Sequence, residues 1–145
     1  MNNYISFQSE RLIIRPTLEQ DAELIYQLMN SPKFIKSKYS NYSLINKKNG
    51  AKIGICGLYD RKGLHGIDIG FGILPEYEGL GYAFESSSRT IKAGFEELEI
   101  SEIKAITNKE NISSQCLLVK LGFNLKGTIM LANENDELLL YKIEK

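Results

Sequence analysis

The sequence predicts a mixed α/β fold in which helices cover both faces of one twisted sheet. Its 145 residues are about the size of one domain, large enough to bury a core without disulfides or metal. Strand and helix patterns follow one another in the order β-α-β-β-β-α-β-α-β-β, which requires parallel and antiparallel neighbours in one sheet. Because no linker, repeat or low-complexity stretch divides the chain, we expect residues 1–145 to form a single domain.

The N-terminal segment is predicted to form a strand followed by a helix. Arg11–Arg15 has the pattern of a strand that Pro16 closes. A capping box formed by Thr17 and Gln20 is then expected to open the helix. Apolar residues keep helical spacing through that helix: Leu18, Ala22, Ile25 and Met29.

Three strands are predicted to follow. Tyr42–Asn46 and Ala51–Tyr59 flank Asn49-Gly50, the pair of residues that favours a tight hairpin. The third strand, Ile67–Leu74, alternates large apolar residues on one face with Asp68 and two glycines on the other.

The second half of the chain is predicted to supply two helices and three short strands. An inward stripe at helical spacing marks a helix from Tyr82 to about Leu98: Phe84, Ser88, Ile91, Phe95 and Leu98. The strand Ile103–Thr107 precedes a helix over Ser113–Leu121, which Gly122 and Phe123 end with the pattern of a Schellman motif. The strands Leu125–Leu131 and Leu138–Ile143 close the fold.

Composition argues against several classes of function. The 18 basic and 18 acidic residues cancel, so the phosphate backbone of a nucleic acid would meet no basic field. The longest apolar runs are far shorter than the roughly 18 residues needed to span a membrane. A single histidine argues against a metal site or a Ser-His-Asp triad. Cys56 and Cys116 each lie in an apolar run and are expected to be reduced, buried thiols of a cytoplasmic protein.

The segment Ile69–Ala83 carries the main chemical signal. Here a strand runs into a glycine-bearing loop that opens a helix, and the first amides of a helix suit a phosphate or pyrophosphate. Gly79 and Gly81 let a ligand approach the backbone without a Cβ in the way. No lysine follows Gly81, which argues against a P-loop, and Phe84 stands where a dinucleotide fingerprint needs its third glycine.

Four motifs in order resemble the GNAT superfamily of N-acetyltransferases, and within it the RimJ/RimL-like branch. They are Ser9–Pro16, Ile69-Gly70-Phe71, Pro75–Ala83, and Asn111-x-x-Ser114 followed by Lys120–Phe123. Together they cover nearly the whole chain. Glu76–Gly81 resembles the acetyl-coenzyme-A pyrophosphate motif of that family, with Glu76 in place of the usual glutamine or arginine.

This resemblance implies a GNAT fold whose two central parallel strands splay apart around the pantetheine arm of acetyl-CoA. Those strands would be Ile67–Leu74 and Ile103–Thr107. It implies cofactor contacts from the strand, the loop and the second late helix: Phe71, Gly72, Ile73, Leu74, Gly79, Leu80, Gly81, Tyr82, Ala83, Asn111 and Ser114. The implied reaction is direct acetyl transfer from acetyl-CoA to a primary amine, for which we expect the α-amine of a protein or peptide.

The catalytic groups are less strongly marked. A backbone N–H near residues 72–74 is the expected donor to the oxyanion. Many members of the superfamily protonate the departing thiolate with a tyrosine, but Leu118 holds that position, so Ser114 is the nearest hydroxyl. Asp68 stands where this branch often carries a glutamate base. The nearby acids Glu10, Glu76 and Glu78 are alternatives.

Three further expectations concern the whole protein. Without the tyrosine, the chain could also be a catalytically weakened module that binds acyl-CoA as a sensor or interaction domain. Dimers are common in the superfamily, which leaves a homodimer open. Members usually carry a second helix before the second strand, whereas Phe34–Ser40 passes almost directly between elements. Either this helix is missing around residues 36–40, or the protein has a loop there that the consecutive residue numbers pass over.

Overall fold

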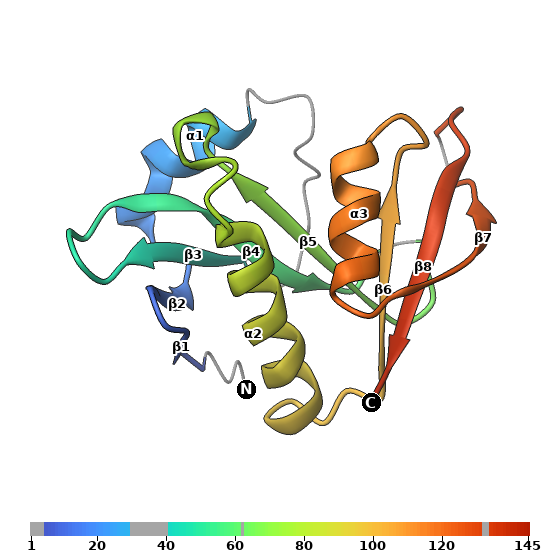
Figure 1. The fold of residues 1–145 in the computed structure, drawn as a ribbon, viewed down its shortest axis with the longest axis horizontal. Helices are drawn as coiled ribbons and strands as arrows, with labels where there is room; N and C mark the ends of the chain where they lie inside the picture. The colour runs from blue at the N-terminus through green and yellow to red at the C-terminus, as the bar shows by residue number, and fades with distance from the viewer. Residues whose placement is uncertain (1–4, 30–40, 62, 132–133) are drawn as a thin grey trace.

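The protein forms one mixed sheet with helices on both faces (Figure 1). The computed structural model describes residues 5–29, 41–61, 63–131 and 134–145, so the short connection at residues 34–40 lies outside the described residues. In that part of the chain the sheet has the strand order β1-β2-β3-β4-β5-β6-β8-β7. The strands are β1 (Phe7–Gln8), β2 (Leu12–Pro16), β3 (Asn41–Asn46), β4 (Lys52–Tyr59), β5 (Ile67–Ile73), β6 (Glu102–Thr107), β7 (Asn124–Ile129) and β8 (Leu138–Glu144). The helices are α1 (Ala22–Met29), α2 (Tyr82–Glu96) and α3 (Ile112–Lys120), with short 3-10 turns η1 (Glu19–Asp21) and η2 (Pro75–Tyr77).

The two central parallel strands separate along their length. β5 and β6 are paired only at their first residues, where Ile67 lies opposite Ile103 and Asp68 opposite Lys104. Beyond this point no ladder joins them in the described residues, and Figure 1 shows β5 diverging from β6. The other neighbouring strands are antiparallel. The predicted mixed sheet with splayed central strands is therefore confirmed.

The helices α1 and α2 lie on opposite faces of the sheet. Leu24 and Leu28 of α1 pack with Ile55 of β4, whereas Ile91 of α2 belongs to the main core with Cys56 of the same strand. Because successive side chains of a strand point to opposite faces, Ile55 and Cys56 mark the two sides. Among the described residues, no helix is long and apolar enough to cross a membrane.

The predicted start of the first helix is wrong. The N-cap of η1 is Leu18, whose amide donates to Asp21 Oδ2 at 2.8 Å, so Asp21 makes the contact expected of a capping residue. Thr17 Oγ1 instead lies 3.0 Å from Ser43 Oγ. Leu18, which the predicted apolar stripe includes, is 51% exposed, and the helix instead buries Leu24 and Leu28. The cause is Asp21, which is fully buried and anchors the turn to the sheet.

The inward face of α2 also differs from the predicted stripe. Ser88 is exposed, and Phe84 and Phe95 are only partly buried. The buried face consists mainly of small residues: Tyr82, Ser86, Ser87, Thr90, Ile91, Ala93 and Gly94. A Cβ at Gly94 would come within 3.1 Å of Ile103 Cδ1. The helix thus lies close to the sheet, and close packing rather than apolar periodicity selects its buried residues.

The end of α3 is the Schellman motif that the sequence predicts. Phe123 N donates to Leu118 O at 2.9 Å, and Gly122 N donates to Val119 O at 3.0 Å. Gly122 has φ of +99°, which favours glycine. Leu118 and Phe123 are both buried in the main core.

Only one of the two cysteines is buried as expected. Cys56 is buried, and this burial raises the pKa of its thiol to about 11. Cys116 is exposed on α3. The apolar run around it misled the prediction because α3 fully buries Leu118 alone.

Candidate active site

The loop between β5 and α2 has the backbone of an anion site. Gly79 and Gly81 have φ of +76° and +84°, a left-handed conformation that side chains disfavour. Gly81 is the N-cap of α2, and no side chain caps it. A helix of 15 residues therefore presents its amino end and its positive dipole at this loop. The predicted loop residues Leu80, Tyr82 and Ala83 belong to the same turn.

Two amides of β5 point toward β6 in the region beyond Asp68 and Lys104, where the two strands are no longer paired; this region is called the gap below. Leu74 N donates to Ile53 O at 2.9 Å, so this amide pairs with the β4 side. Amides alternate between the two sides of an antiparallel strand, and Gly72 lies opposite Ile55. The amides of Phe71 and Ile73 consequently point away from β4, toward the gap. Sequence reasoning could not separate these four residues because it lacked the register.

Helix α3 follows β6 in the chain and packs against it. Asn111 is the N-cap of α3, and the Asn111 side chain accepts from Ser114 N at 3.2 Å. Ser114 is partly buried. Lys120 Nζ lies 4.5 Å from the ring centroid of Phe84, which links α3 to α2. The predicted pair Asn111 and Ser114 thus forms the cap of one helix turn.

Asp68 is fully buried at the closed end of the two parallel strands. Arg61 Nη2 and Nε donate to its two carboxylate oxygens at 2.8 and 3.2 Å. Burial raises the pKa of Asp68, and the Arg61 guanidinium opposes that rise. The alternative acids lie on the surface: Glu10, Glu76 and Glu78 are exposed.

The position of the absent tyrosine lies in the protein core. Leu118 is 1% exposed and has no group that can donate a proton. The structure therefore provides no hydroxyl at this point of α3, and Ser114, one turn closer to the amino end of the helix, carries the nearest one by sequence.

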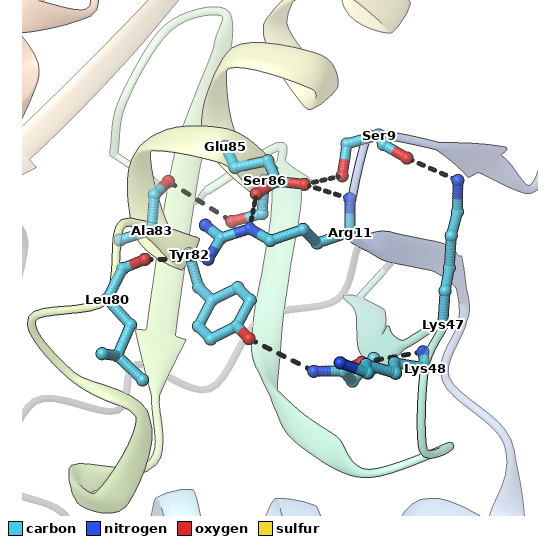
Figure 2. Close-up of polar contacts among 10 residues, drawn as sticks. Ser9, Arg11, Lys47, Lys48, Leu80, Tyr82, Ala83, Glu85 and Ser86 are labelled. Carbon is cyan, nitrogen blue, oxygen red and sulfur yellow. Dashed lines mark hydrogen bonds and ion pairs between the residues drawn. The ribbon is translucent and has the colours of Figure 1, made fainter.

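The sequence interpretation missed a cluster of polar contacts that joins Ser9 and Arg11 to Leu80 and Glu85, at the glycine loop and the start of α2 (Figure 2). Arg11 Nη1 donates to Leu80 O at 3.0 Å, and Arg11 Nε donates to Glu85 Oε2 at 2.7 Å. The other oxygen of Glu85 accepts from Ser9 Oγ and from Arg11 N, both at 2.7 Å. Burial alone would raise the pKa of Glu85, but these hydrogen bonds lower it. Arg11 belongs to the motif Ser9–Pro16, but no local pattern shows that its partners lie 69 and 74 residues away.

The aromatic ring of Tyr82 completes this cluster. Arg11 Cζ lies 4.1 Å from the centroid of that ring, within the range of a cation–π contact. Tyr82 OH accepts a hydrogen bond from Asn46 Nδ2 at 3.2 Å, so the β3–β4 hairpin also reaches the first turn of α2.

Comparison with known proteins defines the class. Residues 34–124 match the family model described as an acetyltransferase (GNAT) domain, which is well over half of the chain. The chain therefore belongs to the GNAT acetyltransferases and is an acetyltransferase enzyme. Members of this family use acetyl-CoA as their co-substrate.

Particular relatives agree with this class. The chain is 28% identical to the uncharacterized N-acetyltransferase YoaA of Bacillus subtilis (strain 168), over 84% of each chain. It is 30% identical to the spermidine N(1)-acetyltransferase of Escherichia coli (strain K12), over 57% of this chain and 45% of that enzyme. A GNAT-family acetyltransferase from Bacillus anthracis has the same fold, with a TM-score of 0.80, 25% identity, and coverage of 97% of this chain and 98% of that one.

Proposed function

We propose that this chain is an acetyl-CoA-dependent N-acetyltransferase of the RimJ/RimL-like branch, which transfers an acetyl group directly to a primary amine. One observation carries the proposal. The gap between β5 and β6 opens beside the uncapped amino end of α2. Free backbone amides of β5, which can pair with another amide-containing chain, therefore lie next to helix amides that can bind an anion. A ligand with a pantetheine arm and a pyrophosphate suits this combination.

The proposed contacts with acetyl-CoA come from the chain's own backbone. The amides of residues 79–83 hold the pyrophosphate at the amino end of α2. The amides of Phe71 and Ile73 point toward the gap: the Phe71 amide pairs with the pantetheine arm as a neighbouring strand would, and the Ile73 amide is left for the thioester carbonyl. Asn111 and Ser114 face the arm from α3. This part of the proposal is tested by calorimetric titration with CoA and acetyl-CoA.

The transfer requires the amine to lose a proton and the thiol of CoA to depart. When bound, acetyl-CoA supplies an activated thioester, so a C–N bond forms as the C–S bond breaks. The Ile73 amide is the proposed donor to the charge that develops on the carbonyl oxygen. Ser114 Oγ is the proposed donor to the departing sulfur, which needs less protonation than an alkoxide because thiols are the stronger acids.

Asp68 is the proposed base for the amine. Its burial favours this role because a raised pKa brings a carboxylate closer to the operating pH. Its ion pair with Arg61 opposes the role, because both carboxylate oxygens are engaged. The Arg61 guanidinium thus lowers the proton affinity of Asp68 and works against its burial, and the pH dependence of an Asp68→Asn variant tests this step.

The proposed acceptor is an α-amino group. An α-amine with pKa near 7.8 is about 14% neutral at pH 7, whereas a lysine amine with pKa near 10.4 is about 0.04% neutral. The difference in the cost of deprotonation is about 3.5 kcal/mol. A site whose only proposed base is engaged in an ion pair therefore suits the more acidic amine.

A panel of acceptors tests this proposal. Rates with peptides that have free N-termini are compared with those for lysine and spermidine at saturating acetyl-CoA. We expect the peptides to be preferred. A clear preference for spermidine, which is the acceptor named for the Escherichia coli relative, would overturn the α-amine assignment.

A second function is an acyl-CoA-binding module with little catalysis. The buried Leu118 and the Asp68–Arg61 ion pair favour it. The same panel separates the two functions. Binding of acetyl-CoA without release of free thiol with any amine would support the module.

A further inference from the structure

We propose that Arg11 is a positioning residue that turns the Gly81 amide toward the pyrophosphate of acetyl-CoA. The inference rests on the proposed function, because it concerns the loop proposed to hold that pyrophosphate. It assigns a role to a residue that lies outside the loop and the gap.

The geometry of one peptide unit carries the inference. In a trans peptide the C=O and the following N–H point in opposite directions, and the described chain has no cis peptide bond. Arg11 Nη1 binds Leu80 O at 3.0 Å, which fixes that carbonyl toward the N-terminal strands. The Gly81 N–H must then point to the opposite side of the loop. Without this bond the peptide could rotate and present a carbonyl oxygen, which repels a phosphate.

The same peptide depends on glycine for its shape. Gly81 has φ of +84°, and the position of its absent Cβ is 3.4 Å from Arg11 Nη2. The glycine allows many backbone conformations, so its residue type alone does not select the one observed. A contact from outside the loop is needed, and Arg11 makes it.

Arg11 is itself held by two side chains of α2. Glu85 accepts from its Nε and from its backbone amide at 2.7 Å each. The Tyr82 ring stacks under its guanidinium. Figure 2 shows the Glu85 and Tyr82 side chains of α2 lying against the Arg11 side chain. Since the arginine cannot turn without breaking them, it orients the loop rather than following it.

Orientation, rather than net charge, is the main contribution. The Glu85 carboxylate neutralises the guanidinium at 2.7 Å, so little positive charge remains to act on a distant phosphate. The planar fork of arginine binds Leu80 O and Glu85 together, whereas lysine has one nitrogen for both.

The experiment compares kinetics of Arg11→Met, Arg11→Lys and the wild type with acetyl-CoA and with acetyl-pantetheine, which lacks the pyrophosphate. We expect Arg11→Met to raise the KM for acetyl-CoA about tenfold, equivalent to about 1.4 kcal/mol. The kcat and the KM for the amine should change less than about twofold. With acetyl-pantetheine, variant and wild type should be alike. Arg11→Lys should remain impaired because it keeps the charge but not the fork.

Arg89→Met is the matched control. Arg89 also joins the N-terminal strands to α2, since its Nε donates to Gln8 O at 2.9 Å, but the contacts observed for it do not include the glycine loop. Its KM for acetyl-CoA should stay near that of the wild type. Thermal unfolding of each variant shows whether the fold is retained, and Arg11→Lys serves if Arg11→Met does not fold.

The outcomes are distinguishable. An unchanged KM for acetyl-CoA in the folded Arg11 variants, full recovery in Arg11→Lys, or an equal loss with acetyl-pantetheine would each overturn the inference and leave the proposed function standing. If the wild type binds neither CoA nor acetyl-CoA in calorimetry, the proposed function fails and the inference with it.

Discussion

Replacing Asp21 with asparagine should strongly destabilise the protein. Asp21 is fully buried between β2, β3 and β4 at the start of the first helical segment. Its carboxylate accepts from Arg15 Nη1 and Nη2 at 2.7 and 2.9 Å, from Leu18 N at 2.8 Å and from Ser43 Oγ at 2.9 Å. Lys52 Nζ forms an ion pair with it at 2.9 Å. Asparagine keeps the size of this group but removes its charge and directs an NH2 at these donors.

The magnitude follows from the two cations that lose their counter-ion. Removing one partner of a buried ion pair costs about 3–5 kcal/mol. The side chains of Arg15 and Lys52 are 20% and 34% exposed and can be partly rehydrated, which favours the lower end. We therefore expect the free energy of unfolding to fall by about 3 kcal/mol. This corresponds to a decrease in Tm of about 6–12 °C for a chain of this length.

The loss should depend on pH in a defined direction. The Arg15 hydrogen bonds hold the pKa of Asp21 well below its ordinary value, so its stabilisation is complete above about pH 4. Below this pH the unfolded state binds a proton first, and the advantage over asparagine shrinks by about 1.4 kcal/mol per pH unit.

Urea unfolding at pH 7, 5 and 3 measures this difference. Asp136→Asn, the same substitution at an exposed aspartate, is the control and should change stability by less than about 0.5 kcal/mol. A loss below about 1 kcal/mol for Asp21→Asn at pH 7, or a loss that is the same at pH 3, would refute the reasoning.

Three other outcomes are expected. Gly81→Ala and Gly50→Ala both place a side chain at positive φ and should each cost about 1–2 kcal/mol in urea unfolding, but only Gly81→Ala should raise the KM for acetyl-CoA; equal KM values would contradict the placement of the pyrophosphate. Asp68→Asn should remove the acidic limb of the kcat/KM profile, and that limb in the wild type should lie above the ordinary aspartate pKa because burial raises it; an unaltered profile means that Asp68 is not the base. A thiol reagent at pH 8 should label exposed Cys116 in the native protein and Cys56 only in urea, since burial raises the pKa of Cys56 to about 11; two thiols reacting at once would contradict that burial.

Local patterns in the sequence predicted much of the fold. The order of the main strands and helices, the hairpin turn at Gly50 and the Schellman ending of α3 were all predicted correctly. Each depends on residues that are close together in the chain, such as Gly122 and Leu118. The same local rules were wrong at the start of the first helix, because the sheet, through Arg15 and Ser43, binds Asp21 and moves the cap.

The face of α2 shows a second limit. Apolar spacing predicted that Ser88 would point inward, whereas Ser86 and Thr90 do. Hydrophobic periodicity assumes that a helix buries its largest apolar residues. Where helix and sheet approach closely, small side chains are buried instead, and the approach depends on residues such as Ile103 on another element.

The sequence by itself determined where the chain forms the glycine turn that is proposed to bind the pyrophosphate, because glycines at positions 79 and 81 before a helix are a local signal. Only the tertiary structure decided in which direction the backbone N–H and C=O groups of β5 and of this turn point. The register of β4 against β5 directs the Ile73 amide to the gap, and Arg11, 69 residues away, binds the Leu80 carbonyl. Both depend on contacts between segments that are distant in the chain, and a hydrogen bond forms only when folding brings donor and acceptor within about 3 Å.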